Sequence, residues 1–216
     1  MKIYKTYRFR MYPERFDQEK INSFLGTKRF IYNYYLNEKE KNNNLTLKEM
    51  KKSLMLLQKE KPWLKEVDGS ILRTTLDDLD KSYQRYYQKI AEKPKFKKYN
   101  NKQSYRTPYI RATYNTKKYQ NIKIDLERKI IKLPKIEEIK IRGYRNLNKF
   151  PYKIINATVI KEVRKYYVSL LVEEEINIKN KLLNHIVGVD LGVKDLITTS
   201  DGYKFKKLEK NNYFRK

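Results

Sequence analysis

Asp190 is the residue of this sequence whose type and surroundings best suit metal chemistry. It lies near the centre of an apolar stretch, residues 186–192, that reads as a strand. A carboxylate held rigidly on a strand can bind Mg²⁺, which takes oxygen ligands in octahedral geometry. Because an unpaired carboxylate is costly in apolar surroundings, a metal-binding role is favoured over a structural one for Asp190. Asp195 and Asp201 are interpreted as turn residues.

A single carboxylate does not make a nuclease site. Two-metal hydrolysis of a phosphodiester needs several carboxylates to hold ions about 3.5–4 Å apart. A Val-Asp-Leu-Gly strand end also occurs in actin-like ATPases, where it faces nucleotide phosphate. The short string alone does not distinguish a nuclease metal ligand from such an ATPase strand. The segment therefore predicts one metal ligand and an incomplete catalytic site.

Two acid-free stretches carry clustered cations. Ten basic and six aromatic residues lie between Glu92 and Asp125, and a second stretch runs from Ile139 to Lys161. Cations interleaved with aromatic rings suit phosphate contact combined with base stacking. The ordinary alternative is a charged surface that only faces solvent. These stretches lie outside the best helix, so ion pairs within a helix do not explain their charges. We therefore expect nucleic-acid binding, with RNA and DNA not separated by composition.

The overall composition supports this expectation. The 216 residues contain 51 Lys and Arg against 25 Asp and Glu, a formal net charge of +26. Phosphate backbones are the obvious compensating partner for such an excess. AT-rich coding DNA would also enrich Lys, Ile, Asn and Tyr, but it would not gather the charges into tracts. The apolar fraction of 39% is enough for a core.

Several functional classes are excluded or disfavoured. The sequence contains no Cys, which excludes disulfides and a thiolate zinc site within it. No run approaches the roughly 18 apolar residues of a membrane span, and the N-terminus lacks an apolar signal core. We expect a soluble, cytoplasmic, nucleoid-associated protein without a membrane partner.

The N-terminal half predicts one strand followed by helices. Residues 2–11 alternate between apolar and basic positions, as in a half-buried strand that Pro13 ends. Residues 15–41 have helical spacing, with Gly26 expected to separate two helical pieces. Residues 46–49 form a capping box that opens a helix of three to four turns, which Pro62 ends. Trp63 and Leu64 are expected to anchor that turn in the core.

The clearest helix follows, and the chain then changes to strands. An apolar stripe of Leu72, Leu76, Leu79, Tyr83, Tyr86 and Ile90 predicts one helix whose opposite face carries Arg73, Lys81 and Arg85. Short strands are expected over residues 122–126, 129–133, 136–142, 153–159 and 166–172, forming a small antiparallel barrel or sheet with Gly143 in a turn. Residues 173–184 read as an exposed linker, and residues 185–205 as a new strand pair.

Taken together, several segments resemble the TnpB (OrfB) family of insertion-sequence proteins, relatives of the type V CRISPR nucleases. The resemblance runs in order through nearly the whole chain, and 187–192 resembles the first RuvC motif. The other matching segments are residues 7–13, 24–26 with Arg29, 32–33, 63–67, 76–80, 103–108, 131–135 and 141–143.

The resemblance implies an α+β fold. An antiparallel β-barrel (wedge) would contain an inserted helical recognition domain, followed by the first hairpin of an incomplete RNase H-like (RuvC) domain. The implied boundaries are a first wedge strand at 1–13, a helix-turn-helix-like recognition domain at 14–92, the wedge barrel at 93–180 and the start of RuvC at 181–216.

The resemblance also implies an activity and partners. The family is described as transposase and acts as an RNA-guided, Mg²⁺-dependent DNA endonuclease. It binds a guide RNA from the transposon end and double-stranded target DNA, and base pairing reads the target sequence. Its nuclease uses two further acidic residues and a cysteine zinc ribbon downstream of the first Asp. Residues 191–216 contain neither, so we expect a truncated protein that binds nucleic acid without cutting it.

The expected site residues follow from this interpretation. Asp190 would be the catalytic and metal-binding residue, active with Mg²⁺ only if another chain, a C-terminal nuclease half, completes the site. No zinc is expected in this chain. Phosphate or RNA contacts are expected from Arg8, Arg10, Arg29, Tyr32, Asn33, Lys97, Lys98, Arg106, Arg142 and Arg145.

Three alternatives stay open. In the first, this sequence is one half of a split endonuclease. The second is a fragment of a sugar-kinase-like or actin-like ATPase, although nothing before residue 185 fits that fold. The third is a conventional helix-turn-helix regulator, which leaves the basic strand region unexplained.

Overall fold

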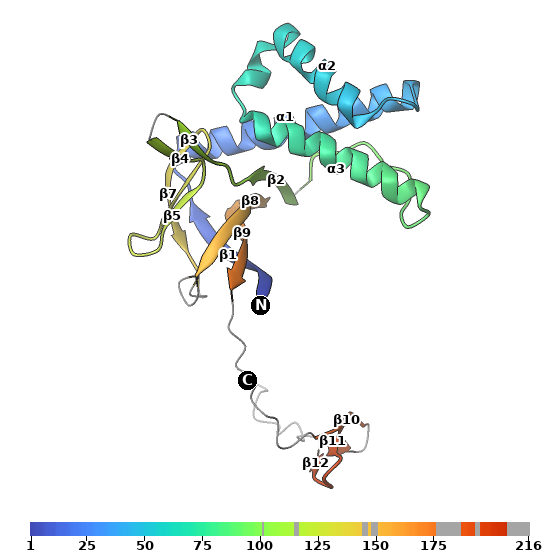
Figure 1. Ribbon diagram of the computed structural model, residues 1–216, viewed down its shortest axis with the longest axis vertical. Helices are drawn as coiled ribbons and strands as arrows, with labels where there is room; N and C mark the ends of the chain where they lie inside the picture. The colour runs from blue at the N-terminus through green and yellow to red at the C-terminus, as the bar shows by residue number, and fades with distance from the viewer. Residues whose placement is uncertain are drawn as a thin grey trace, which may run out of the picture. The chain divides into compact units, whose positions relative to one another are not determined.

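The computed structural model describes residues 1–100, 102–114, 117–143, 147, 151–175, 187–192 and 195–206. The chain divides into two compact units, Met1–Ile176 and Asn177–Lys216, and each is considered separately (Figure 1). Among the described residues, no helix combines the length and the apolar character that crossing a membrane requires.

The first unit combines three α-helices with an antiparallel sheet, which confirms the α+β class. The helical elements are α1 (Arg15–Lys41), α2 (Leu47–Glu60), the short 3-10 helix η1 (Pro62–Lys65) and α3 (Gly69–Tyr87). The strands are β1 (Lys2–Tyr12), β2 (Lys102–Pro108), β3 (Arg111–Tyr114), β4 (Lys117–Gln120), β5 (Lys123–Asp125), β6 (Ile130–Leu133), β7 (Ile136–Arg142), β8 (Tyr152–Glu162) and β9 (Lys165–Glu175).

Seven strands form the main sheet in the order β2-β8-β9-β1-β7-β6-β5, and β3 pairs only with β4 within the described residues. The predicted strands match β5 to β9, whereas β2, β3 and β4 were not predicted. Of the two forms expected, a small antiparallel barrel or sheet, the described strands form an antiparallel half-barrel sheet with β2 and β5 at its edges. Side chains from the helices satisfy the β2 edge, because Lys28 Nζ donates to Ser104 O at 3.0 Å and Thr74 Oγ1 to Arg106 O at 3.0 Å.

β1 confirms the predicted alternation and crosses the centre of the sheet. Tyr7, Phe9 and Met11 are buried, and the intervening residues are more exposed. β1 pairs with β9 on one side and β7 on the other, both antiparallel. Gly143 directly follows β7, and residues 144–146, with which it would form the predicted turn, lie outside the described residues. A Cβ at Gly143 would collide with the Phe9 ring, so the glycine permits a close approach between backbone and core.

The predicted break at Gly26 is wrong, because α1 is one continuous helix of 27 residues. Ile21, Phe24, Leu25 and Ile31 are buried on one stripe that continues through the glycine. A helical glycine costs only about 1 kcal/mol relative to alanine. Packing of the stripe on both sides outweighs that penalty.

The capping box that opens α2 is confirmed, with Glu49 N donating to Thr46 Oγ1 and Thr46 N to the Glu49 carboxylate. α2 ends at Glu60, and η1 starts at Pro62 as expected. Leu64 is fully buried, but Trp63 is 42% exposed and packs edge-on against the Phe30 ring, with 5.1 Å between the ring centres. Only Leu64 therefore anchors this turn in the core.

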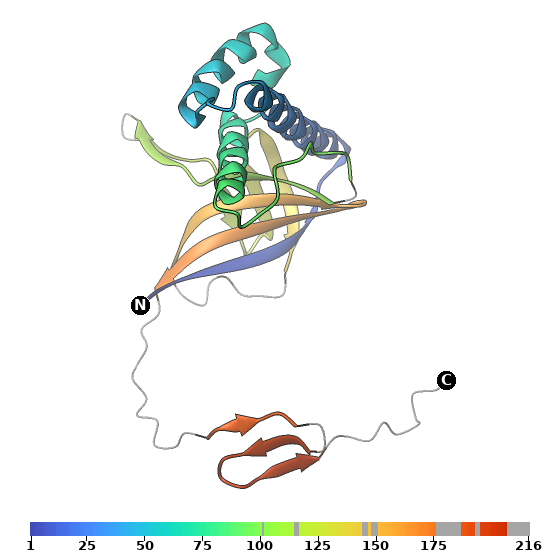
Figure 2. The ribbon, with the colours of Figure 1, turned by 90° about the vertical axis from the view of Figure 1, so that its right-hand side faces the viewer.

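The stripe of α3 is confirmed from Leu72 to Tyr83 and fails after it. α3 ends at Tyr87, so Ile90 lies beyond the helix, and both Tyr86 and Ile90 are exposed. All three helices lie on one side of the sheet (Figure 2). The Phe24 ring packs on Tyr105 of β2 at 5.8 Å, which joins the helical layer to the sheet in one core.

The linker expected at residues 173–184 is wrong for its first three residues. Residues 173–175 complete β9, and Glu174 is fully buried, while residues 176–186 lie outside the described part. Glu174 stays in the strand because the Tyr7 hydroxyl and Lys5 Nζ donate to its carboxylate. A buried carboxylate with two donors is satisfied.

The second unit contains a small antiparallel sheet in the order β10-β11-β12. Its strands are β10 (Val189–Asp190), β11 (Asp195–Thr199) and β12 (Lys204–Lys206), one more than the predicted pair. Asp201 lies in the turn between β11 and β12 as expected, whereas Asp195, also interpreted as a turn residue, begins β11. Gly202 has a φ of +91°, a conformation that glycine adopts readily.

Candidate nucleic-acid interface

A groove of about 320 Å³ lies where α1, α3 and the chain leading into β2 meet. α1 contributes Lys28, Arg29 and Tyr32 to its wall. α3 contributes Asp78 and Ser82, and the remaining wall comes from Leu25 of α1 and from Lys97, Lys98, Asn100 and Lys102–Ser104. Asp78 is the single acid among the described lining residues. Five cations line the groove: Lys28, Arg29, Lys97, Lys98 and Lys102.

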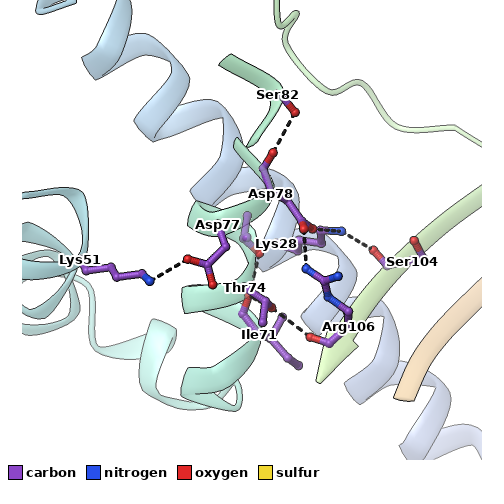
Figure 3. A network of polar contacts seen from close by, with 10 residues as sticks. Lys28, Lys51, Ile71, Thr74, Asp77, Asp78, Ser82, Ser104 and Arg106 are labelled. Carbon is purple, nitrogen blue, oxygen red and sulfur yellow. Dashed lines mark hydrogen bonds and ion pairs between the residues drawn. The ribbon is translucent and has the colours of Figure 1, made fainter. Parts of the chain in front are cut away.

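Asp78 is the centre of a polar network (Figure 3). Its Oδ1 accepts from Arg106 at 2.6 Å, and its Oδ2 lies 3.8 Å from Lys28 Nζ. Burial lowers the pKa of Lys28, and the neighbouring cations Arg106 and Lys97 lower it further, whereas Asp78 acts in the opposite direction. Asp78 thus holds two cations beside the groove that would otherwise repel each other.

Asn33 holds the strand-like segment that carries Lys97. Its amide donates to Lys97 O at 2.9 Å and accepts from Lys97 N at 2.7 Å. The Lys97 ammonium then lies 5.0 Å from the centre of the Tyr32 ring, which is only 5% exposed. In this structure Asn33 and Tyr32 position Lys97, and the Lys97 side chain itself is exposed.

Arg29 crosses the groove from α1 toward β2. One guanidinium nitrogen donates to Gln103 Oε1 at 2.8 Å, and the guanidinium carbon lies 5.6 Å from the centre of the Tyr99 ring. In the described part of the chain, no carboxylate lies within ion-pair distance of Arg29, Lys97 or Lys98. These three side chains can therefore meet an anion without first breaking an ion pair.

A second basic surface lies on the face of the sheet opposite the helices. Arg8 packs over the Tyr167 ring at 4.0 Å and pairs with Glu162 at 2.9 Å. Arg10 of β1 stands directly opposite Arg142 of β7, and no described carboxylate pairs with either. Like charges in opposed positions destabilise a sheet, so an anion bound between these arginines would relieve the repulsion.

The structure thus separates the expected contact residues into two sets. Arg29, Tyr32, Lys97 and Lys98 line the groove, and Asn33 and Arg106 contact its lining residues. The opposite face of the sheet carries Arg8, Arg10 and Arg142. Arg145 lies outside the described residues.

Asp190 is in the second unit, on the edge strand β10 opposite Thr198. Its side chain is exposed, as are those of Val187, Val189 and Leu191. The apolar surroundings expected for Asp190 are therefore absent from the described part of this unit, because a three-stranded sheet buries little surface. Nor do the described residues contain a group of three or more His, Cys, Asp or Glu side chains that could hold a metal ion.

Two comparisons agree with this architecture. A family profile described as a helix-turn-helix domain, of the OrfB type, matches residues 1–45. InsQ of Escherichia coli (strain K12), named "Putative RNA-guided DNA endonuclease InsQ", is 29% identical over 223 residues, covering 100% of this chain and 51% of InsQ. The chain is thus similar to this OrfB-type profile at its N-terminus and to InsQ over its whole length. It spans about half the length of InsQ.

The helix-turn-helix match covers β1 and α1, and α2 begins just beyond it at Leu47. Since α1 also lines the groove, the matched segment contributes part of the candidate interface.

Mg²⁺, the metal implied by the TnpB family, does not fit the described residues. A two-metal nuclease site needs several carboxylates, and the described residues contain no group of three or more possible metal ligands that includes Asp190. Within these residues no step of hydrolysis can be assigned, and the sequence holds no cysteine for a zinc ribbon.

Sequence reasoning missed Lys28, Asp78 and Gln103 as parts of the groove. A signal existed for Lys28, because it occupies a position on the buried stripe of α1, between Leu25 and Ile31. A cation at an apolar stripe position points to a buried polar network. Asp78 and Gln103 gave no comparable signal, since their partners lie on other elements.

Proposed function

We propose that these 216 residues form the nucleic-acid-binding part of a TnpB-family protein, which holds a guide RNA and target DNA and does not cut DNA unaided. The observation that carries this proposal is the groove, where Arg29, Lys97 and Lys98 converge with no described carboxylate within ion-pair distance. Neutralising phosphates with such cations releases counterions and drives binding. The basic face around Arg10 and Arg142 offers a second contact area.

The proposal includes the division known from the family. Residues 1–13 and 93–180 would act as the wedge, residues 14–92 as the recognition domain, and residues 181–216 as the start of RuvC. In this view the guide RNA derives from the transposon end and the target is double-stranded DNA in the cytoplasm. The name of InsQ, an RNA-guided DNA endonuclease, supports these partners.

The experiment measures binding to RNA from the end of the protein's own transposon by gel shift, with an unrelated RNA of equal length as competitor. We expect the cognate RNA to bind more tightly at every salt concentration. Equal affinity for both RNAs would reduce the function to nonspecific polycation binding, and no binding to any polynucleotide would overturn it. DNA hydrolysis by this polypeptide alone would overturn the non-cutting part.

A second candidate function is the N-terminal half of a split endonuclease. The exposed Asp190 carboxylate supports it, because a second chain could add further acidic ligands around it. The test is co-expression with a separately encoded half that carries acidic residues and a Cys-x-x-Cys pair. Mg²⁺-dependent cleavage that disappears in Asp190→Ala would support this function, and no cleavage by the pair would exclude it.

A further inference from the structure

We propose that the groove binds an unpaired nucleotide of a single strand, RNA or DNA, largely independently of its base, with Tyr99 as the stacking platform. This inference rests on the proposed function and deepens it. It names the form of nucleic acid that the groove takes and a contact residue outside the expected set.

The size of the groove favours one unpaired nucleotide. Its volume of about 320 Å³ is at the lower end of the range for small-molecule sites. A paired base with its partner and both backbones cannot enter such a space. A duplex could contact the rim, but only a nucleotide without a paired partner can fill the interior.

Tyr99 has the features of a stacking platform. Its side chain is among the most exposed aromatic ones, at 68%, and it lies directly before the residues that line the groove at Asn100 and Lys102–Ser104. Arg29 already lies 5.6 Å from the ring centre, and Gln103 holds Arg29. A base stacked on Tyr99 would therefore contact a ring that is already paired with Arg29 before the nucleic acid binds.

The phosphate contacts lie beside this platform. Lys97 and Lys98 follow one another on the segment that Asn33 clamps through the Lys97 backbone. The clamp fixes the backbone at Lys97, which directly precedes Lys98 and lies two residues before Tyr99, so less backbone order must be gained on binding. Lys97 and Lys98 can contact the phosphate of a nucleotide, and Tyr99, the next residue, can stack on its base.

Base selectivity is expected to be low because side chains suited to reading base edges are already engaged. The Gln103 amide accepts from Arg29 at 2.8 Å and donates to Asn100 O at 3.0 Å. The Ser82 hydroxyl donates to Asp78 O at 2.8 Å. Stacking and charge contacts, which every base and either sugar can make, then provide most of the affinity.

The test is fluorescence anisotropy of the full chain with labelled oligonucleotides of one sequence, as single-stranded DNA, single-stranded RNA and blunt duplex DNA. Tyr99→Ala is expected to weaken binding of both single strands by about 5- to 100-fold, the range for one lost base stack. Duplex binding should change less than about 2-fold, and Tyr99→Phe should retain single-strand affinity because it keeps the ring.

Tyr203→Ala is the matched control, since Tyr203 is 67% exposed but lies in the second unit. It should leave every affinity unchanged. Single-strand binding that survives Tyr99→Ala, or that falls equally for the duplex, overturns this inference and leaves the proposed function in place. A strong preference for one base overturns the claim of base independence. Failure of the unaltered chain to bind any oligonucleotide overturns the proposed function itself.

Discussion

At the residue scale, Asp78 controls the charge of the groove. It is the single acid among the described lining residues, and both of its oxygens face cations. An acid in this position has two opposed effects. It orders Arg106 and Lys28, which helps the fold, and it cancels positive charge that phosphates would otherwise meet.

We predict that Asp78→Asn raises affinity for nucleic acid by about 2- to 10-fold, because one negative charge leaves the groove while the side-chain shape is kept. The free energy of unfolding should fall by about 1 kcal/mol as the partly exposed ion pairs are lost. Anisotropy titrations and thermal melts measure the two effects.

Asp77→Asn is the control, since Asp77 pairs with Lys51 at 2.6 Å and does not line the groove. It makes the same charge change one residue away. Equal gains in affinity from both variants would mean that net charge, and not the groove, governs binding.

At the scale of elements, two glycines test the packing of different parts of the fold. Gly143 lies where the end of β7 contacts the core side of β1, and Gly26 lies in the helical layer. Gly143 approaches the Phe9 ring so closely that a Cβ has no room, whereas a Cβ at Gly26 of α1 would meet nothing within 4 Å. The same substitution should therefore have opposite effects at the two positions.

Gly143→Ala is predicted to lower the free energy of unfolding by about 1–3 kcal/mol, because the buried Phe9 ring must move. Gly26→Ala should raise it by about 0.5–1 kcal/mol through helix propensity alone. Urea denaturation followed by circular dichroism measures both. A loss of stability in Gly26→Ala would contradict the description of α1 as an unbroken helix with an open position at 26.

The pairing of β1 with β9 ends in a buried carboxylate that makes it sensitive to acid. The hydrogen bond from the Tyr7 hydroxyl holds the pKa of Glu174 below its ordinary value of 4.5; burial opposes this effect, and Lys5 adds to it. A folded-state pKa below the unfolded value stabilises the fold above about pH 4.5, and the stabilisation is lost as the pH falls through the folded value.

Glu174→Gln should therefore lower the free energy of unfolding at neutral pH by about 1–3 kcal/mol, since a hydrogen-bonded charge is lost. Its stability should also fall less steeply than that of the unaltered protein as the pH drops below 4.5. Glu175→Gln serves as the comparison, because that side chain is exposed. An identical acid profile for all three proteins would rule out Glu174 as the source.

At the scale of the whole molecule, the formal net charge of +26 predicts strongly salt-dependent binding. Most of this charge is spread over the surface, so the contribution of the groove to salt dependence is tested by removing two of its cations. Lys97→Ala with Lys98→Ala should reduce the slope of log affinity against log salt by about 1–1.5 for a single strand. Lys204→Ala with Lys206→Ala, on β12, removes equal charge and should leave the slope unchanged.

The sequence alone determined the features that depend on neighbours along the chain. The alternation of β1, the capping box of α2, the positions of β5 to β9 and the ordered family resemblance could all be predicted, because each is a pattern within a short window. The clustering of cations and the isolation of Asp190 from other motifs could be read in the same way.

Only the tertiary structure decided how these elements meet. The groove joins residues far apart in sequence: Lys28 contacts Ser104 across 76 positions, and Asn33 contacts Lys97 across 64. The same holds for the open edge of the sheet, the uninterrupted α1 and the burial of Glu174. Each depends on side chains from other elements, which hydrogen-bond to the backbone of an edge strand, pack against the apolar stripe of a helix or pair with a buried charge. Local periodicity carries no information about those partners, because packing selects them only once the chain has folded.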